Sequence, residues 1–304
     1  MPSSNVRFSD IGLVSITSLS IVRDCARLLV DLYFTGIQLS LLSANSQSER
    51  MMGVSLSLLE SDETAQQGLV MLSDLVAAEI YCCSHLNRLN VASLYDLAKH
   101  LQSFHSLLAN KDVQARLREV LKTDGLMMHK DSVGMRIDLP NEIGQLTELH
   151  QEFHSFPFGI NAAVLWVPLT RISRFHGTLA YYPLPHLSEP FPFDGDPAEQ
   201  SRLLAKGRMQ EAQKIGGLQV SEEDLGAIQY LEAEPGQCYI FSASLPHSSL
   251  LADPTAEFAR LTCQARFFDT RDPFMAWKHG KGIMWEGLKN PSDAWKFWQE
   301  YSCG

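Results

Sequence analysis

The sequence predicts a mainly β fold preceded by a helical N-terminal part. Within residues 1–124 the only proline is Pro2, and apolar residues recur at the three- and four-residue spacing of amphipathic helices. From residue 125 onward prolines occur regularly, and turn residues separate short apolar runs. We therefore expect a helical part at 1–124, packed on a β core at 125–271, and a Trp-rich C-terminal tail at 272–304.

The individual elements are predicted from the same patterns. Helical spacing of apolar residues predicts helical segments at 22–44, 63–82, 92–109 and 112–122. Strands are predicted for the runs VGMRIDL, INAAVLWVPL, QCYIF and ARLTCQARFF. The last run alternates polar and apolar residues, so one of its faces should be polar.

A long insertion, 181–216, is predicted between two of these strands. Residues 181–197, YYPLPHLSEPFPFDGDP, hold five prolines and must form a loop, with a short helix expected at 198–215 behind it. We expect this insertion to act as a lid. The tail carries tryptophans at loose helical spacing, namely Trp277, Trp285, Trp295 and Trp298. They predict cover for the core or a contact in a homodimer.

Composition and charge narrow the class of partner. The chain has 304 residues, 45% of them hydrophobic, and a net charge of -10, which repels polyanions. We therefore expect no nucleic-acid and no membrane partner, and a small-molecule substrate instead. The six cysteines form no CxxC pair, as expected of reduced thiols. The apolar stretch 11–22 is too short to span a bilayer, and no signal-type segment precedes it, so a cytoplasmic location is expected.

The stretch HQEFH at 150–154 is a near miss for a helical zinc-hydrolase motif. That motif, HExxH, needs the glutamate directly after the first histidine, where this chain has Gln151. On a helix, Glu152 would point away from His150. On a strand, side chains two apart share a face, and both residues could serve one metal. We predict a strand here, because a proline, a glycine and a buried strand follow closely.

A second histidine and acid pair competes with this one. His129 and Asp131 have the same spacing, with an aspartate in place of the glutamate. We prefer His150 because it is followed by the strand ending LWVPL and by FHGTLAYYPLPH, whereas His129 leads only into VGMRID. His129 is then expected to be structural or to lie behind the ligands.

The third element is a pair of strands at 235–270 joined by a loop that starts at LPHSS. His247 lies in this loop, and Arg260 begins the polar face of the strand that follows. Two histidines and one carboxylate form the facial triad suited to non-haem Fe(II) and O₂ chemistry. An arginine about a dozen residues beyond the distal histidine can hold a carboxylate through two hydrogen bonds.

Together these motifs resemble the phytanoyl-CoA dioxygenase-like (PhyH) family of Fe(II)- and 2-oxoglutarate-dependent oxygenases. The resemblance covers roughly residues 125–270 and rests on the order and spacing of four segments. They are HQE at 150–152, LWVPL at 165–169, GTLAYYPLPH at 177–186 and PGQCYIF…LPHSS…AR…RFFDT at 235–270.

The resemblance implies a fold, cofactors and residue roles. The core would be a double-stranded β-helix, a cupin-like jelly roll, with Fe(II) bound by His150, Glu152 and His247 as the catalytic centre. Arg260 would bind the distal carboxylate of the cosubstrate 2-oxoglutarate, Ser249 would assist it, and O₂ would be the oxidant. The expected reaction is hydroxylation of an unactivated C–H bond of a natural product or metabolite, with release of succinate and CO₂.

Three departures from the family pattern matter. Glu152 replaces the usual aspartate, which still supplies a carboxylate, so hydroxylation is expected and halogenation is not. The interval from His247 to Arg260 is slightly long, which leaves Arg266 as a rival anchor about 20 Å along the strand. The usual PGSH reads PLPH at 183–186, so the loop after it could be shaped for a different substrate.

Further polar residues are candidates for substrate contact. Those next to the motifs are Arg136, Asp138, His154 and Trp166, and those beyond the buried strand are Arg171, Arg174 and His176. A solvated surface position is the competing interpretation for each charged one. Two other functional classes stay open: a zinc hydrolase using His150 and His154, and a non-catalytic jelly-roll binding protein.

Overall fold

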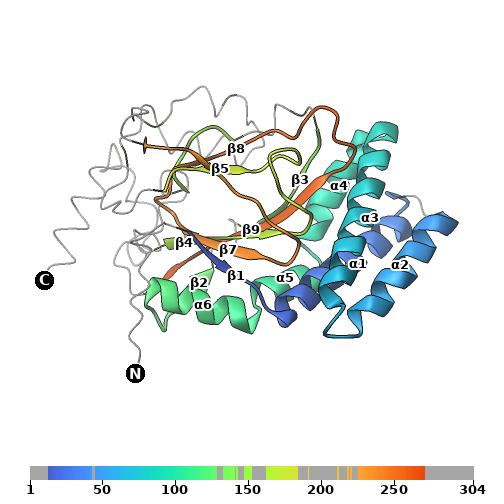
Figure 1. The fold of residues 1–304 in the computed structure, drawn as a ribbon, viewed down its shortest axis with the longest axis horizontal. Coiled ribbons are helices and arrows are strands. Elements are labelled where there is room, and N and C mark those ends of the chain that lie inside the picture. The colour runs from blue at the N-terminus through green and yellow to red at the C-terminus, as the bar shows by residue number, and fades with distance from the viewer. Residues whose placement is uncertain are drawn as a thin grey trace, which may run out of the picture.

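The computed structural model describes residues 13–42, 45–128, 133–140, 142, 147–152, 162–183, 191, 211, 218, 220 and 225–270. Its helices are α1 (Leu19–Gln38), α2 (Ser46–Leu59), α3 (Ala65–Leu86), α4 (Arg88–Ala98), α5 (Gln102–Leu108) and α6 (Lys111–Leu121). Its strands are β1 (Leu13–Ile16), β2 (Leu126–Met128), β3 (Gly134–Asp138), β4 (Ala162–Pro168), β5 (Leu179–Tyr181), β6 (Gln229–Tyr230), β7 (Cys238–Ser242), β8 (His247–Ser249) and β9 (Arg260–Asp269). The prediction of a helical N-terminal part followed by strands is confirmed (Figure 1).

The strands form two antiparallel sheets. The larger has the order β1-β7-β4-β9-β2, with β3 also paired to β9, and the smaller has the order β6-β5-β8. A core cluster joins the sheets, because Trp166 and Phe241 of the large sheet pack with Leu179 of the small one. The space between the sheets is therefore where side chains from both can converge.

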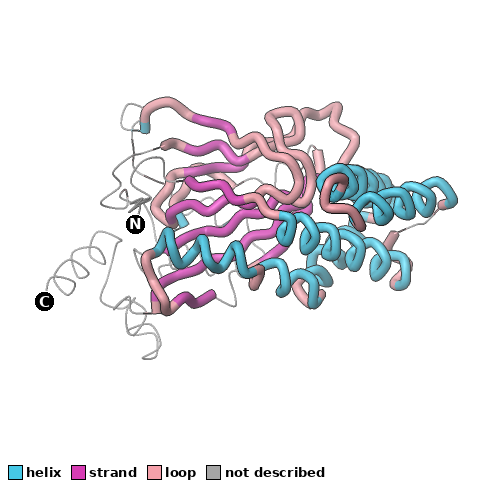
Figure 2. The backbone as a smooth tube through the Cα atoms, turned by 60° about the horizontal axis from the view of Figure 1, so that its bottom comes forward, coloured by secondary structure: helices cyan, strands magenta, loops and turns pink. Residues whose placement is uncertain are grey.

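The helices cover the other face of the large sheet (Figure 2). Alternate residues of β9, from Leu261 through Cys263 and Ala265 to Phe267, join one large core cluster with residues of α1, α3 and α6. The predicted polar face of β9 consequently points toward the small sheet. The apolar face anchors the strand, and the polar face can be used for chemistry.

Several elements were missing from the sequence prediction, among them β1 and α2. Strand β1 lies ahead of the helices and pairs with β7, with Leu13 opposite Phe241. Helix α2 buries a small and mostly polar face, made of Ser48, Met52 and Ser55. Because hydrophobic periodicity is weak on such a face, the pattern that predicts amphipathic helices does not find it.

Helix α3 is the only one, among the residues described, that is long and apolar enough to cross a membrane. Its apolar residues Leu69, Leu72 and Val76 are fully buried. They belong to the core cluster that the helices share with the large sheet. Here α3 serves as a core helix.

Gly177 lies on the segment that connects β4 of the large sheet with β5 of the small sheet. We expect this position to tolerate no side chain. Its φ is +76°, and a Cβ would lie 2.7 Å from the backbone nitrogen of Ala252 and 2.9 Å from the carbonyl oxygen of Leu250. Gly177→Ala should therefore lower the free energy of unfolding by about 1–3 kcal/mol, the usual cost of a strained backbone conformation. Denaturant unfolding measures this change.

Gly53 provides the matched control. It lies inside α2, and a Cβ there would meet nothing within 4 Å. Gly53→Ala should stabilise the protein by roughly 0.5–1 kcal/mol, because alanine loses less backbone entropy in a helix. Equal stability of the two variants would contradict the conformation assigned to Gly177.

Candidate metal centre

Three predicted ligands converge between the sheets. His150, Glu152 and His247 each offer one ligand atom, and these atoms all lie within 4.8 Å of one another. The Nε2 atoms of His150 and His247 lie 3.9 and 3.8 Å from Oε1 of Glu152. Among the residues described, this is the only group of three or more His, Cys, Asp or Glu side chains close enough to hold a metal ion.

The backbone joins the two histidines directly. His150 and His247 form an isolated antiparallel bridge, with N–H to O distances of 3.0 Å in both directions. Their rings stand 4.2 Å apart between centroids. Since His247 is the first residue of β8, the small sheet fixes the separation of the two imidazoles.

The predicted strand across HQEFH is wrong at Gln151 and Glu152. The strand-like pairing is limited to His150, and the backbone is helical at Glu152. The carboxylate nevertheless lies 3.9 Å from Nε2 of His150, so the two side chains meet without the shared face of a strand. His154, His129 and Asp131 lie outside the described residues.

Hydrogen bonds from the main chain orient both imidazoles. Nδ1 of His247 lies 2.8 Å from the carbonyl oxygen of Leu245, and Nδ1 of His150 lies 2.8 Å from that of Glu148. With the proton on Nδ1, each ring donates to its carbonyl and turns the Nε2 lone pair toward Glu152. Burial, together with the charge of His150, lowers the pKa of His247 to about 3, so this ring is neutral at pH 7.

Glu152 is a buried carboxylate with a permanent counter-charge. Only 3% of the residue is exposed, and Nη2 of Arg266 donates a short hydrogen bond to Oε1. Burial alone would raise the pKa of Glu152, but the charge of Arg266 and the contact with His150 outweigh it. The pKa therefore lies well below its usual range, and the carboxylate stays ionised and able to bind a cation.

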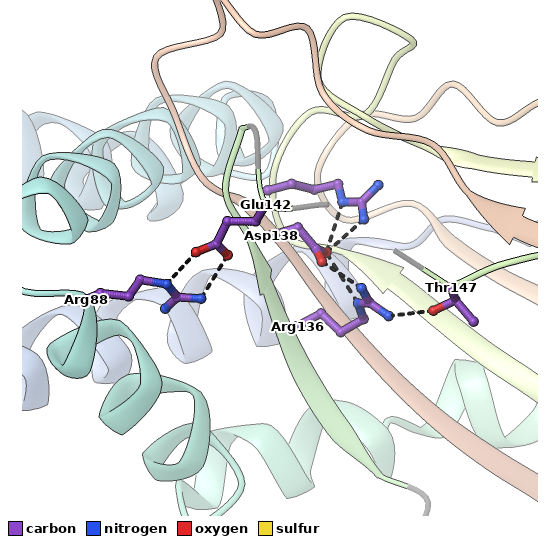
Figure 3. Close-up of polar contacts among 6 residues, drawn as sticks. Arg88, Arg136, Asp138, Glu142 and Thr147 are labelled. Carbon is purple, nitrogen blue, oxygen red and sulfur yellow. Dashed lines mark hydrogen bonds and ion pairs between the residues drawn. The ribbon is translucent and has the colours of Figure 1, made fainter. Parts of the chain in front are cut away.

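Arg260 contacts a different carboxylate. Its Nε and Nη2 atoms lie 3.1 and 2.8 Å from Oδ2 of Asp138, the residue opposite it on β3. Arg136 donates to the same carboxylate and, through Nη1, to Oγ1 of Thr147 at 3.1 Å (Figure 3). The polar face of β9 thus presents two arginines to two separate acids, Asp138 and Glu152.

Three more residues that were predicted to contact cosubstrate or substrate lie on β8, in the core between the sheets and at the surface. Ser249 is on β8, and its backbone N–H donates to the carbonyl oxygen of Thr147 at 2.9 Å. Trp166 is 6% exposed and packs edge-on against Tyr239 in the core between the sheets. Arg171, by contrast, forms a surface ion pair with Glu234.

The remaining two predicted residues are engaged locally. The guanidinium of Arg174 lies 4.5 Å from the ring centroid of Tyr230. Nδ1 of His176 lies 2.7 Å from Oγ of Ser173, within the same loop. Neither contact involves the three converging ligands.

Sequence reasoning gave no role to Gln151, which the structure buries completely between the two neighbouring ligands. Its Nε2 donates to the carbonyl oxygen of Ser244, and its Oε1 accepts from the backbone N–H of Phe191 at 2.9 Å. Gln151 therefore ties the ligand segment to the β7–β8 turn. The available signal was a polar residue placed between two predicted ligands.

Comparison with known proteins identifies one family. The family model described as phytanoyl-CoA dioxygenase (PhyH) matches residues 86–251. This range includes His150, Glu152 and His247. No protein of curated function matches the sequence.

Several solved structures match parts of this chain at low sequence identity. The non-haem α-ketoglutarate-dependent epimerase SnoN from nogalamycin biosynthesis is 18% identical with a TM-score of 0.42, over 58% of this chain and 61% of that one. The non-haem monooxygenase ThoJ is 14% identical with a TM-score of 0.48, over 87% and 76%. EctD from S. alaskensis, solved with 2-oxoglutarate and 5-hydroxyectoine, is 15% identical with a TM-score of 0.36, over 59% and 58%. The chain therefore spans less than two thirds of the length of SnoN.

Proposed function

Because the chain belongs to the phytanoyl-CoA dioxygenase (PhyH) family, we propose that it is an Fe(II)- and 2-oxoglutarate-dependent dioxygenase. The observation that carries the proposal is the convergence of His150, Glu152 and His247 within the matched region. The two antiparallel sheets, which enclose these residues, are interpreted as a double-stranded β-helix, or jelly roll.

The donor set fits Fe(II). Two imidazole Nε2 atoms and one ionised carboxylate are the ligands of the facial triad, which leaves metal positions open for cosubstrate and O₂. The main-chain hydrogen bonds to both Nδ1 atoms hold the rings in the tautomer that a metal requires. When bound, Fe(II) supplies O₂ activation coupled to decarboxylation of 2-oxoglutarate to succinate.

Arg260 is the proposed anchor for the distal carboxylate of 2-oxoglutarate, with Ser249 beside it. Arg260 lies on the inward face of β9, and no hydrogen bond in the described part of the chain uses its Nη1 atom. Arg266 instead donates a hydrogen bond to Glu152, and its proposed role is to hold this metal ligand in place. An arginine suits the anchor role because its planar fork matches a carboxylate.

The proposed reaction is hydroxylation of a C–H bond in a small molecule. Trp166 lies in the core between the sheets and is retained as a substrate contact. His154, the lid at 181–216 and the tail at 272–304 are also proposed to surround the substrate. Their part would be to exclude water from the metal, since a dry site strengthens the electrostatic contacts within it.

An anaerobic titration tests the proposal. Purified protein is mixed with Fe(II) and then with 2-oxoglutarate, and its visible absorption is recorded. We expect an absorption band that needs both additions and disappears in Glu152→Ala. A protein that gives no band, but hydrolyses esters or amides when loaded with Zn(II), would instead be a zinc hydrolase.

A further inference from the structure

Gln151 joins three parts of the molecule that lie far apart in the sequence. Its side chain is fully buried, and the residue stands between two of the proposed metal ligands. Nε2 donates to the carbonyl oxygen of Ser244, and Oε1 accepts from the backbone N–H of Phe191 at 2.9 Å. One side chain therefore connects the ligand segment, the β7–β8 turn and the insertion at 181–216.

The two ends of this side chain match their partners in hydrogen-bond chemistry. A carbonyl oxygen can only accept and a backbone N–H can only donate, so residue 151 must offer one donor and one acceptor. Glutamine offers both, whereas an ionised glutamate only accepts and methionine has no N–H and only a weak acceptor. Because a buried polar atom without a partner is strongly unfavourable, we expect the two contacts to persist together.

The Ser244 end of Gln151 reaches the third ligand. The carbonyl oxygen of the next residue, Leu245, lies 2.8 Å from Nδ1 of His247 and orients that ring. The N–H of Leu245 in turn donates to the carbonyl oxygen of Ser242 at 3.0 Å, within the same turn. A shift of Ser244 would therefore move the group that orients His247.

The Phe191 end of Gln151 is defined by two prolines. Phe191 stands between Pro190 and Pro192, and proline has no backbone N–H, so Phe191 carries the only main-chain donor of this three-residue stretch. A residue that precedes a proline also favours an extended backbone. Such a stretch presents a single N–H and loses little conformational entropy when that N–H is bound.

We propose that Gln151 is a positioning residue that couples the insertion, at Phe191, to the geometry of the metal ligands. The inference rests on the proposed function. The two contacts of Gln151 hold the segment that carries His150 and Glu152 against the turn that orients His247, and they hold Phe191 against both. The coupling runs in both directions, because a metal that favours the arranged ligands must also favour the contact with Phe191.

The first test is Mn(II) binding by Gln151→Met, which keeps the length of the side chain and loses both hydrogen bonds. We expect its dissociation constant for Mn(II) to rise at least about 10-fold, the usual effect of residues that support metal ligands. Gln114→Met is the matched control, because Gln114 on α6 also donates to a main-chain carbonyl, that of Leu108 at 2.9 Å. This control should bind Mn(II) as the wild type does. Wild-type affinity in Gln151→Met would overturn the inference.

Two variants of Phe191 test the other end without changing the ligand segment. Phe191→Pro removes the N–H and should weaken Mn(II) binding roughly 5-fold, the usual contribution of one hydrogen bond, whereas Phe191→Ala keeps the N–H and the affinity. In a Gln151→Met background Phe191→Pro should have no further effect, because both changes break the same contact. Equal effects of Phe191→Pro in both backgrounds, or an equal loss in Phe191→Ala, would contradict the coupling. If Gln151→Met does not fold, the comparison of the two Phe191 variants decides alone.

Hydrogen exchange at Phe191 tests the reverse direction. Since residues 190–192 contain a single amide, mass spectrometry of a peptide that includes them can follow this N–H. Mn(II) should slow its exchange in the wild type and leave it unchanged in Gln151→Met. A purely structural role of Gln151 would not make this protection depend on the metal. Unchanged exchange in the wild type on addition of Mn(II) would refute the coupling.

The two levels of the proposal fail differently. If the wild type does not bind Mn(II) at all, the proposed metal centre is wrong and the coupling is wrong with it. If the wild type binds Mn(II) and the Gln151 and Phe191 variants bind it equally well, only the role of Gln151 is wrong.

Discussion

Replacing His247 with alanine is expected to abolish Fe(II)-dependent succinate formation. His247 is 4% exposed, begins β8, and offers an Nε2 atom whose orientation the carbonyl of Leu245 fixes. Loss of a residue that is hydrogen-bonded to a metal ligand lowers metal affinity or activity roughly 10- to 100-fold. Loss of the ligand itself should therefore lower them further. The measurements are iron content after dialysis and succinate release from 2-oxoglutarate.

Two further variants make this result specific. His105→Ala removes an exposed histidine on α5, whose Nε2 lies 2.9 Å from the carbonyl oxygen of Lys99, and should keep full iron content. His154→Ala should also retain iron, since His154 is proposed to face the substrate. If His154→Ala lost its metal while His247→Ala kept it, the ligand set would be that of the zinc-hydrolase alternative.

Replacing Arg260 with methionine is expected to weaken 2-oxoglutarate binding at least about 100-fold while the metal site stays intact. Each hydrogen bond to a charged group contributes about 1.5–3 kcal/mol, and a forked contact contains two. Their loss corresponds to two or more factors of ten in the dissociation constant. Calorimetry with Mn(II)-loaded protein measures the change.

Arg266→Met is the matched comparison, because both arginines lie on the inward face of β9. It removes the contact with Glu152 and should alter metal affinity more than 2-oxoglutarate affinity at saturating metal. Since Arg260→Met also leaves Asp138 without one partner, Arg260→Lys should be measured beside it as the charge-conserving variant. If only Arg266→Met weakened 2-oxoglutarate binding 100-fold, Arg266 would be the anchor and Arg260 would not.

Strand β9 could be predicted because polar and apolar residues alternate along it, so that each kind lies on one face. Leu261 and Ala265 face the helices, while Arg260 and Arg266 face inward. The same approach failed for α2, whose buried face is small and polar. It also joined α4 and α5 into one predicted segment, although the chain leaves the helical conformation between Ala98 and Gln102.

The candidate site was predictable in its residue types and less so in its geometry. The sequence indicates His150, Glu152 and His247 by motif and order, but it does not indicate that the strand-like pairing stops after His150, where the buried Gln151 side chain donates to the carbonyl oxygen of Ser244. The pairing of Arg266 with Glu152 depends on strand register, which no local pattern contains. The substrate could not be predicted, because the sequence contains no pattern typical of a CoA, nucleotide or phosphate site.

The two domain boundaries at 124 and 271, the homodimer contact and the cytoplasmic location stay predictions. So does the lid at 181–216, of which residues 184–190, 192–210 and 212–216 fall outside the described part of the chain. Each can be tested apart from the chemistry.

Succinate formation under ¹⁸O₂ tests the central claim most directly. Iron-loaded protein and 2-oxoglutarate are incubated under the labelled gas, and succinate is analysed by mass spectrometry beside the Glu152→Ala variant. In a 2-oxoglutarate-dependent dioxygenase one atom of O₂ enters the new carboxylate of succinate, so labelled succinate is expected from the wild type and none from the variant. Unlabelled succinate, no succinate, or equal labelling in Glu152→Ala would contradict the assignment of this site.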